Sequence, residues 1–114
     1  MTGALPPLLS ELSRPGRVGY CTQKAGLINM ARALALDHAK QNIRVNSLSP
    51  GPILTKRYLR NFPNVEAAQK SSQTLFDRLG RPEEIASGAV FLASDEASFM
   101  TGADLLIDGG YTAV

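Results

Sequence analysis

Two segments of the sequence have the composition of β-strands, and helical segments lie between them. Residues 43–48 (IRVNSL) alternate apolar and polar side chains, whereas residues 103–107 (ADLLI) form a short, wholly apolar run. Strands joined through helices pair in parallel, by a right-handed crossover. Two strands make a poor sheet, and a parallel sheet needs cover on both faces. The sequence therefore predicts an α/β fold that forms the edge of a larger sheet, with ADLLI buried on both faces.

The segment 20–39 predicts a long helix, because strong helix formers such as Leu, Ala, Met, Gln and Arg dominate it. One helical face is predicted to pack on the body of the protein: Tyr20, Lys24, Leu27, Ala31, Leu34, Ala35 and His38. The opposite face is small and mostly uncharged: Thr22, Ala25, Gly26, Asn29, Ala33 and Leu36. Exposed faces usually carry charge, so this face is predicted to pack against a helix of another subunit. The alternative is an exposed face that is simply rich in alanine.

The remaining segments have local signals of different strength. Pro82 followed by two glutamates predicts a helix start, and EEIASGAVFLA continues the helix to about Ala93, with a further turn from Ser94. The turn residues SPGP at 49–52 are expected to end the first strand. Residues 65–79 are compatible with another helix, after a loop at 61–64. Residues 1–17, which hold three prolines, are expected to form an irregular arm or a short helical turn.

Length and composition exclude several classes of protein. A chain of 114 residues suffices for one domain. The net charge of +2, with Lys and Arg scattered, argues against a nucleic-acid partner. The single cysteine, Cys21, allows no internal disulfide and favours a reducing compartment. No run is apolar enough to span a membrane, and the start does not resemble a secretory signal. The protein is expected in the cytoplasm, and no metal site is predicted.

The feature with the clearest chemical meaning is Tyr20 with Lys24, which are one turn apart on the predicted helix. An ammonium beside a phenol favours the phenolate and lowers the pKa of the hydroxyl. Tyrosine then becomes a usable proton donor and acceptor nearer to neutral pH. A lone Tyr and Lys at this spacing also occur by chance, so their context decides.

That context resembles the short-chain dehydrogenase/reductase family. The segment YCTQKAGLINMARALALDHAKQNIRVNSLSPGPILT is similar to the family's catalytic helix and following strand, and DRLGRPEEIASGAVFLASDEASFMTGADLLIDGG is similar to its C-terminal segment. The resemblance covers about residues 18–111. It implies that residues 18–114 are the C-terminal half of a doubly wound, parallel-sheet Rossmann fold, which is incomplete here. The implied activity is NAD(P)-dependent hydride transfer between a small-molecule alcohol and a carbonyl.

The resemblance also implies roles for individual residues. Tyr20 matches the tyrosine that exchanges a proton with the substrate oxygen, and Lys24 matches the lysine that binds the nicotinamide ribose. The positions implied to contact the nicotinamide are Pro50, Gly51, Ile53 and Thr55. Asn46 matches an asparagine with a structural role. The resemblance further implies a homo-oligomer, formed through the helix 20–39 and the C-terminal segment that includes Asp108-Gly109-Gly110.

Some features of the family are not found in this sequence. No glycine-rich turn between a strand and a helix is present to hold a pyrophosphate, nor the residue that selects NAD or NADP. Ser10 and Ser13 lie too close to Tyr20 to be the family's catalytic serine. We therefore expect part of an oxidoreductase that is inactive alone and that binds NAD or NADP poorly without the rest of the site. The alternative is a non-catalytic, truncated product that acts by oligomerisation with full-length relatives.

Overall fold

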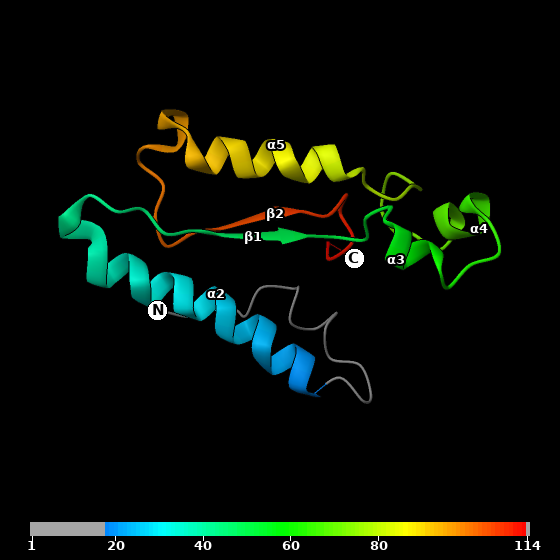
Figure 1. The fold of residues 1–114 in the computed structure, drawn as a ribbon, viewed down its shortest axis with the longest axis horizontal. Helices are drawn as coiled ribbons and strands as arrows, with labels where there is room; N and C mark the ends of the chain where they lie inside the picture. Colours follow the sequence, from blue (N-terminus) through cyan, green and yellow to red (C-terminus); the bar gives the residue numbers. More distant parts are fainter. Residues whose placement is uncertain (1–17, 114) are drawn as a thin grey trace.

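The computed structural model describes residues 18–113, in which two helices cover a two-stranded sheet from opposite sides (Figure 1). The elements follow the chain as helix α2 (Val18–His38), turn η1 (Ala39–Gln41), strand β1 (Ser47–Pro50), helices α3 (Lys56–Leu59), α4 (Val65–Lys70) and α5 (Pro82–Ala93), turn η2 (Asp95–Ala97) and strand β2 (Asp104–Ile107). The two strands are parallel. This arrangement confirms the predicted α/β fold. The arm predicted over residues 1–17 lies outside the described residues.

The first strand lies further along the chain than predicted. It begins at Ser47 rather than at residue 43, and it runs through Ser49 to Pro50, where SPGP was expected to end it. In the register of the sheet, Ser47 lies opposite Asp104 and Pro50 lies opposite Ile107. The residues before Ser47 are held differently. The Val45 carbonyl accepts the Gly102 N–H (2.7 Å), while the Val45 N–H donates to the Thr101 hydroxyl (3.1 Å).

Proline is tolerated at the end of β1 because its nitrogen faces away from β2. The N–H groups of Ser47 and Gly51 donate to the Ala103 and Ile107 carbonyls, both at 2.9 Å. Backbone groups alternate along a strand, so the Pro50 nitrogen points to the other edge. No ladder hydrogen bond between β1 and β2 is lost there.

Helix α2 agrees closely with the prediction over 20–39, but its packing face differs from the predicted one. The buried residues are Ile28, Ala31 and Ala35, whereas Tyr20 is 46% exposed and Leu27 is 50% exposed. The helix packs on β1, and its N-terminal half diverges from the sheet (Figure 1). The face predicted for the C-terminal half is therefore correct. In the N-terminal half, Tyr20, Lys24 and Leu27 do not belong to the core.

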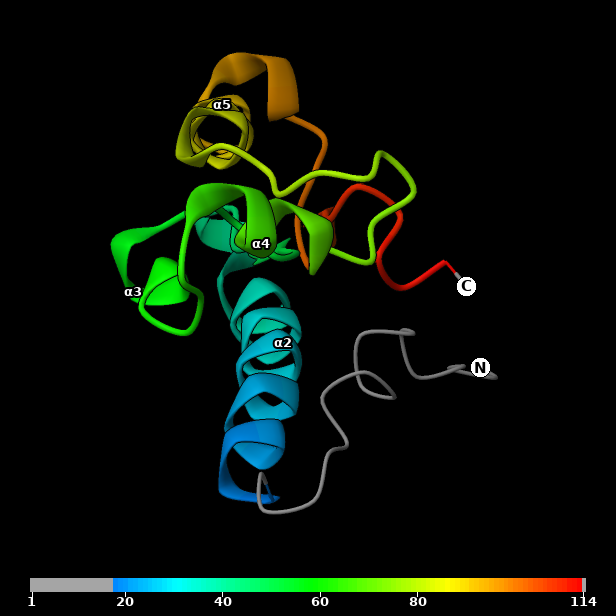
Figure 2. The ribbon, with the colours of Figure 1, turned by 90° about the vertical axis from the view of Figure 1, so that its right-hand side faces the viewer.

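Helix α5 covers the other face of the sheet, opposite α2 (Figure 1), and in Figure 2 these two helices lie at opposite ends of the view with α3 and α4 between them. The predicted start is confirmed, because Pro82 is the first helical residue and Glu84 accepts the Arg81 N–H at 2.8 Å. Gly88 allows a close approach, since a Cβ there would lie 2.4 Å from the Ile107 Cδ1. Strand β2 is only half-buried, contrary to the prediction. Leu106 is 41% exposed because it points away from α5, on the face that α2 covers incompletely.

The stretch between β1 and α5 forms two short helices beyond the carboxyl ends of the strands (Figure 1). The Thr55 hydroxyl caps α3, and the Asn64 side chain caps α4. The helix anticipated over 65–79 ends at Lys70, and the positive φ of 53° at both Gln73 and Asp77 prevents a helix through the rest of the segment. The predicted loop at 61–64 and turn from Ser94 are present. None of the described helices is long and apolar enough to cross a membrane.

Candidate functional site

Tyr20 and Lys24 lie together near the start of α2. The helix places them one turn apart, and the Lys24 Nζ lies 5.6 Å from the centre of the Tyr20 ring. Both side chains are exposed, because this half of α2 diverges from the sheet. An ammonium over an aromatic ring is attracted by the electron-rich face of the ring. The predicted pair is therefore assembled on the surface of the helix, where a ligand can reach it.

The strand-end turn, residues 50–53, is held from two sides. On one side, the Gly51 N–H donates to the Ile107 carbonyl (2.9 Å), and a Cβ on Gly51 would lie only 2.6 Å from the Asp108 Cα. On the other side, the Gly80 N–H donates to the Pro52 carbonyl (3.0 Å) and Ile53 forms a bridge with Gly80. The turn consequently has little freedom to move. A fixed turn at the carboxyl end of a parallel strand is a common position for a ligand site.

Thr55, the last residue of the predicted nicotinamide set, lies just beyond this turn as the cap of α3. Its hydroxyl oxygen accepts the Tyr58 N–H at 3.1 Å. Capping uses the hydroxyl as an acceptor, so its proton is still free to be donated to a ligand. Thr55 therefore combines a structural role with the chemistry needed to hold an amide oxygen.

A pocket of about 100 Å³ opens where the two strands end. Ile53 from the strand-end turn, Asp108 after β2, Thr74 and Phe76 from the preceding loop, and Ile85 of α5 are among its lining residues. Its wall is mainly apolar, with a few polar groups, as is usual for small-molecule sites. In the described part of the chain, this pocket includes Ile53 of the predicted site residues, but not Tyr20, Lys24 or Thr55.

The pocket is bordered by an ion pair that the sequence reasoning missed. The Arg78 guanidinium donates to both carboxylate oxygens of Glu84, at 2.9 and 2.8 Å. These hydrogen bonds, together with the one from the Arg81 N–H, lower the pKa of Glu84 to about 2. The same pair raises the pKa of Arg78. The sequence signal for Glu84 was its place in the first turn of α5, but nothing local indicated Arg78 as its partner.

The Asp108 carboxylate forms a second polar feature at the end of β2. One oxygen accepts the Gly110 N–H (2.8 Å), and the other accepts the Thr112 N–H (3.0 Å) and hydroxyl (2.7 Å). Burial acts to raise the pKa of Asp108, but the hydrogen bonds from Thr112 and Gly110 hold it below its ordinary value. Asp108 therefore stays ionised and holds the turn that follows β2.

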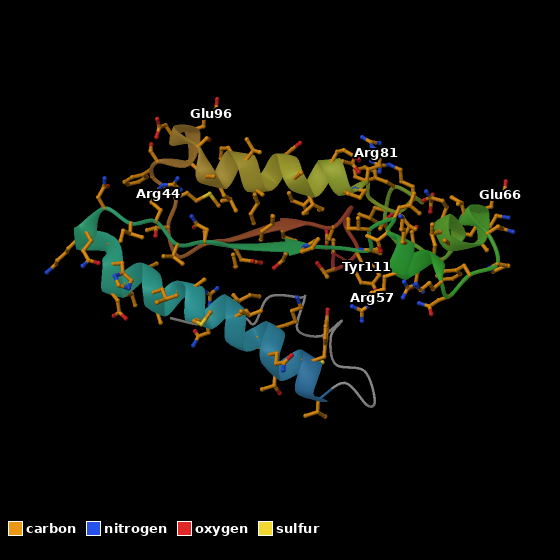
Figure 3. All side chains as sticks on the ribbon, in the orientation of Figure 1. Arg44, Arg57, Glu66, Arg81, Glu96 and Tyr111 are labelled. Carbon is orange, nitrogen blue, oxygen red and sulfur yellow. The ribbon has the colours of Figure 1, made fainter. Side chains whose placement is uncertain are left out.

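The structure thus brings the predicted residues into two groups rather than one. Pro50, Gly51 and Ile53 lie at the end of β1, against Asp108 and Gly80. Tyr20 and Lys24 form a separate pair on α2. Around the first group, Figure 3 shows Arg57 and Arg81 toward the carboxyl ends of the strands, whereas Arg44 lies at the opposite end. The same end also carries Glu66 (Figure 3), and Arg81 pairs with Glu84 at 3.4 Å, so the charge around the pocket is mixed.

Comparison with known proteins finds a matching family model and several relatives. A family model described as "Enoyl-(Acyl carrier protein) reductase" matches residues 8–112. The chain is 41% identical over 105 residues to a 2,5-dichloro-2,5-cyclohexadiene-1,4-diol dehydrogenase of Sphingobium indicum, covering 92% of this chain and 42% of the relative.

Solved structures with the same fold include two dehydrogenases. A short chain dehydrogenase family protein from Francisella tularensis matches with a TM-score of 0.79 at 36% identity, over 93% of this chain and 48% of that chain. A 4-hydroxyisoleucine dehydrogenase complexed with NADH matches with a TM-score of 0.79 at 38% identity. The match covers 94% of this chain and 44% of the dehydrogenase. The chain spans less than half the length of each of these three proteins.

Proposed function

The chain belongs to the short-chain dehydrogenase/reductase family, and from this premise we propose that it carries the proton-transfer half of an NAD(P)-dependent alcohol dehydrogenase site. The observation that carries the proposal is the position of the Lys24 ammonium, 5.6 Å from the centre of the Tyr20 ring on an exposed helical face. Two of its relatives are named as dehydrogenases of hydroxyl compounds, and one of these was solved with NADH. The substrate is accordingly proposed to be a small-molecule alcohol or the corresponding carbonyl.

The residues at the strand ends fit one end of such a cofactor. The strand-end turn offers the side chains of Pro52 and Ile53 to the pocket, an apolar surface that suits a flat ring. The Thr55 hydroxyl, which accepts the Tyr58 N–H as a helix cap, still has its proton to donate to an amide oxygen. A bound nicotinamide would supply or accept the hydride. The residues proposed to hold it at the strand end are Pro50, Gly51, Ile53 and Thr55.

The proposed roles on α2 concern the proton. In carbonyl reduction, the Tyr20 hydroxyl donates its proton to the substrate oxygen, and in alcohol oxidation the phenolate accepts it back. The positive charge of Lys24 favours the phenolate form that this exchange requires, and its N–H groups can donate to ribose hydroxyls. Because the chain spans 42% of the diol dehydrogenase, we expect no turnover by the 114-residue chain alone.

A reconstitution experiment tests this proposal. The 114-residue chain is mixed with a separately produced N-terminal half of a relative such as the diol dehydrogenase, and NADH formation is followed with NAD and a panel of small alcohols. We expect activity in the mixture that neither piece has alone. Tyr20→Phe should abolish the activity, and Tyr58→Phe on α3 is the control that should retain it. An equal loss of activity in Tyr20→Phe and Tyr58→Phe, or activity that persists in Tyr20→Phe, would contradict the role of Tyr20 in proton transfer.

The alternative, a non-catalytic partner of full-length relatives, has its own supporting observation. The face of α2 predicted to pack on another helix is exposed, and Leu36 on it is 82% exposed. We propose that α2 and the C-terminal segment form a contact between subunits, because an uncovered leucine on a face of small residues suits helix packing. Leu36→Glu should prevent co-purification with an intact relative. Co-purification without any turnover in reconstitution would favour this alternative over the enzyme.

A further inference from the structure

Two loops at the pocket rest on one short segment that follows β2. On one side of this segment lies the strand-end turn, whose Gly51 N–H donates to the Ile107 carbonyl. On the other side lies the loop of residues 74–76, whose Leu75 N–H donates to the Gly109 carbonyl at 2.8 Å. The segment from Ile107 to Gly109 is thus a common support for both loops.

The support is held differently on its two sides. A Cβ on Gly51 would lie 2.6 Å from the Asp108 Cα, a backbone atom that cannot move aside. On the other side the loop is held by the hydrogen bond from the Leu75 N–H to the Gly109 carbonyl and by contact of the Leu75 side chain with Gly110. A change in the shape of the segment must therefore move the strand-end turn and the loop 74–76 together.

The Asp108 carboxylate determines the shape of the segment. It accepts hydrogen bonds from the Gly110 N–H, the Thr112 N–H and the Thr112 hydroxyl. Gly109 and Gly110 have φ angles of 62° and 78°, which glycine adopts without steric cost, so the hydrogen bonds to the carboxylate select this conformation among those open to glycine. Hydrogen bonds to an ionised carboxylate are stronger than those between neutral groups.

We propose that Asp108 is a positioning residue that fixes the strand-end turn and the loop 74–76 relative to each other. Ile53 of the strand-end turn and Thr74 and Phe76 of the loop line the pocket together with Asp108, so the carboxylate sets how these lining residues lie relative to each other. That this pocket receives the nicotinamide rests on the proposed function. The linkage between the two loops is independent of the proposed function.

Amide hydrogen exchange, measured by NMR on the 114-residue chain without cofactor, tests the linkage. In Asp108→Asn one acceptor oxygen becomes a donor, so either the Gly110 N–H or the Thr112 N–H loses its acceptor. We expect the Gly51 and Leu75 amides to exchange about tenfold faster relative to the Ser47 amide, which lies at the far end of β1. The matched control is Asp104→Asn. That carboxylate binds the Ser47 and Ser49 hydroxyls at 2.5 and 2.8 Å, so its loss should accelerate Ser47 rather than Gly51 and Leu75.

Two outcomes would overturn the inference: unchanged exchange at Gly51 and Leu75, or equal acceleration of all three amides, which is the pattern of a general loss of stability. If Asp108→Asn does not fold, Thr112→Val removes only the hydroxyl bond. It should shift the same two amides several-fold relative to Ser47, and an unchanged ratio would again overturn the inference.

An NADH titration of the same variants separates this inference from the proposed function. If the native chain binds NADH, Asp108→Asn should raise the Kd several-fold and Asp104→Asn should leave it nearly unchanged. Equal Kd values for the native chain and Asp108→Asn would count against the positioning role. If the native chain does not bind NADH while the two amides respond as expected, the linkage stands and the cofactor role fails.

Discussion

Arg78 and Glu84 form a two-point ion pair across the start of α5, with nitrogen–oxygen distances of 2.9 and 2.8 Å. The Glu84 carboxylate also accepts the Arg81 N–H, which the helix leaves without an intrahelical partner. A single side chain thus caps α5 and attaches it to the loop that borders the pocket. The relative position of loop and helix therefore depends on the ionised state of Glu84.

This dependence predicts how stability changes with pH. The pKa of Glu84 in the folded chain is about 2, below its ordinary value of 4.5. The ion pair therefore contributes stability that is fully present above pH 4.5 and is lost as the pH falls from 4.5 toward 2. Thermal unfolding of the native chain and of Glu84→Gln should give melting temperatures that differ near neutral pH and converge in acid. Glu83→Gln, in the same helical turn, should produce a smaller difference, and a gap that persists near pH 2 would contradict the assignment.

Gly51→Ala should destabilise the fold. The new Cβ would lie 2.6 Å from the Asp108 Cα, and a backbone atom cannot move aside as the end of a side chain can. Separation of the two strand ends should cost about 1–3 kcal/mol, measured by urea unfolding. The matched control is Gly26→Ala on α2, where a Cβ would meet nothing within 4 Å. That change should stabilise the chain by about 0.5–1 kcal/mol, because glycine is unfavourable inside a helix. Equal effects of the two substitutions would show that Gly51 is not confined.

Asn46→Ala should detach the start of β1 from the loop before β2. The Asn46 amide donates to the Met100 carbonyl at 2.8 Å and accepts the Ala103 N–H at 3.1 Å. Loss of both bonds leaves half-buried backbone groups without these partners, at a cost of about 1–3 kcal/mol in the free energy of unfolding. Asn29→Ala, on the exposed face of α2, should be neutral or slightly stabilising. If Asn46→Ala leaves the free energy of unfolding unchanged, water replaces the amide hydrogen bonds at no cost.

Local signals explain which parts of the fold could be predicted from sequence. Helix α5 was located because Pro82 and Glu84 mark its start within a few residues, and α2 because its composition is consistently helical. The start of β1 was misplaced because it depends on pairing with Asp104, far along the chain. No pattern within residues 43–48 reveals where the partner strand begins.

In the candidate site, too, local features could be predicted from the sequence, whereas contacts between distant segments could not. Helical periodicity correctly placed Lys24 beside Tyr20, but it could not determine which face α2 turns to the sheet. Ile28 is buried and Leu27 is half exposed, and one residue rotates the helix by about 100°. The contacts from Arg78 to Glu84 and from Gly51 to Asp108 join separate segments, so their geometry appears only in the folded chain.

The most direct test of the central claim, that Lys24 and the strand-end turn form part of a nicotinamide site, is a fluorescence titration of the 114-residue chain with NADH and NADPH. We predict weak but saturable binding of at least one of them that weakens further, about tenfold or more, in Lys24→Ala, because a charged hydrogen-bond donor is lost. Lys40→Ala, in the turn η1 at the far end of α2, should bind like the native chain. Absence of binding by a folded chain, or equal binding by all three proteins, would contradict the claim.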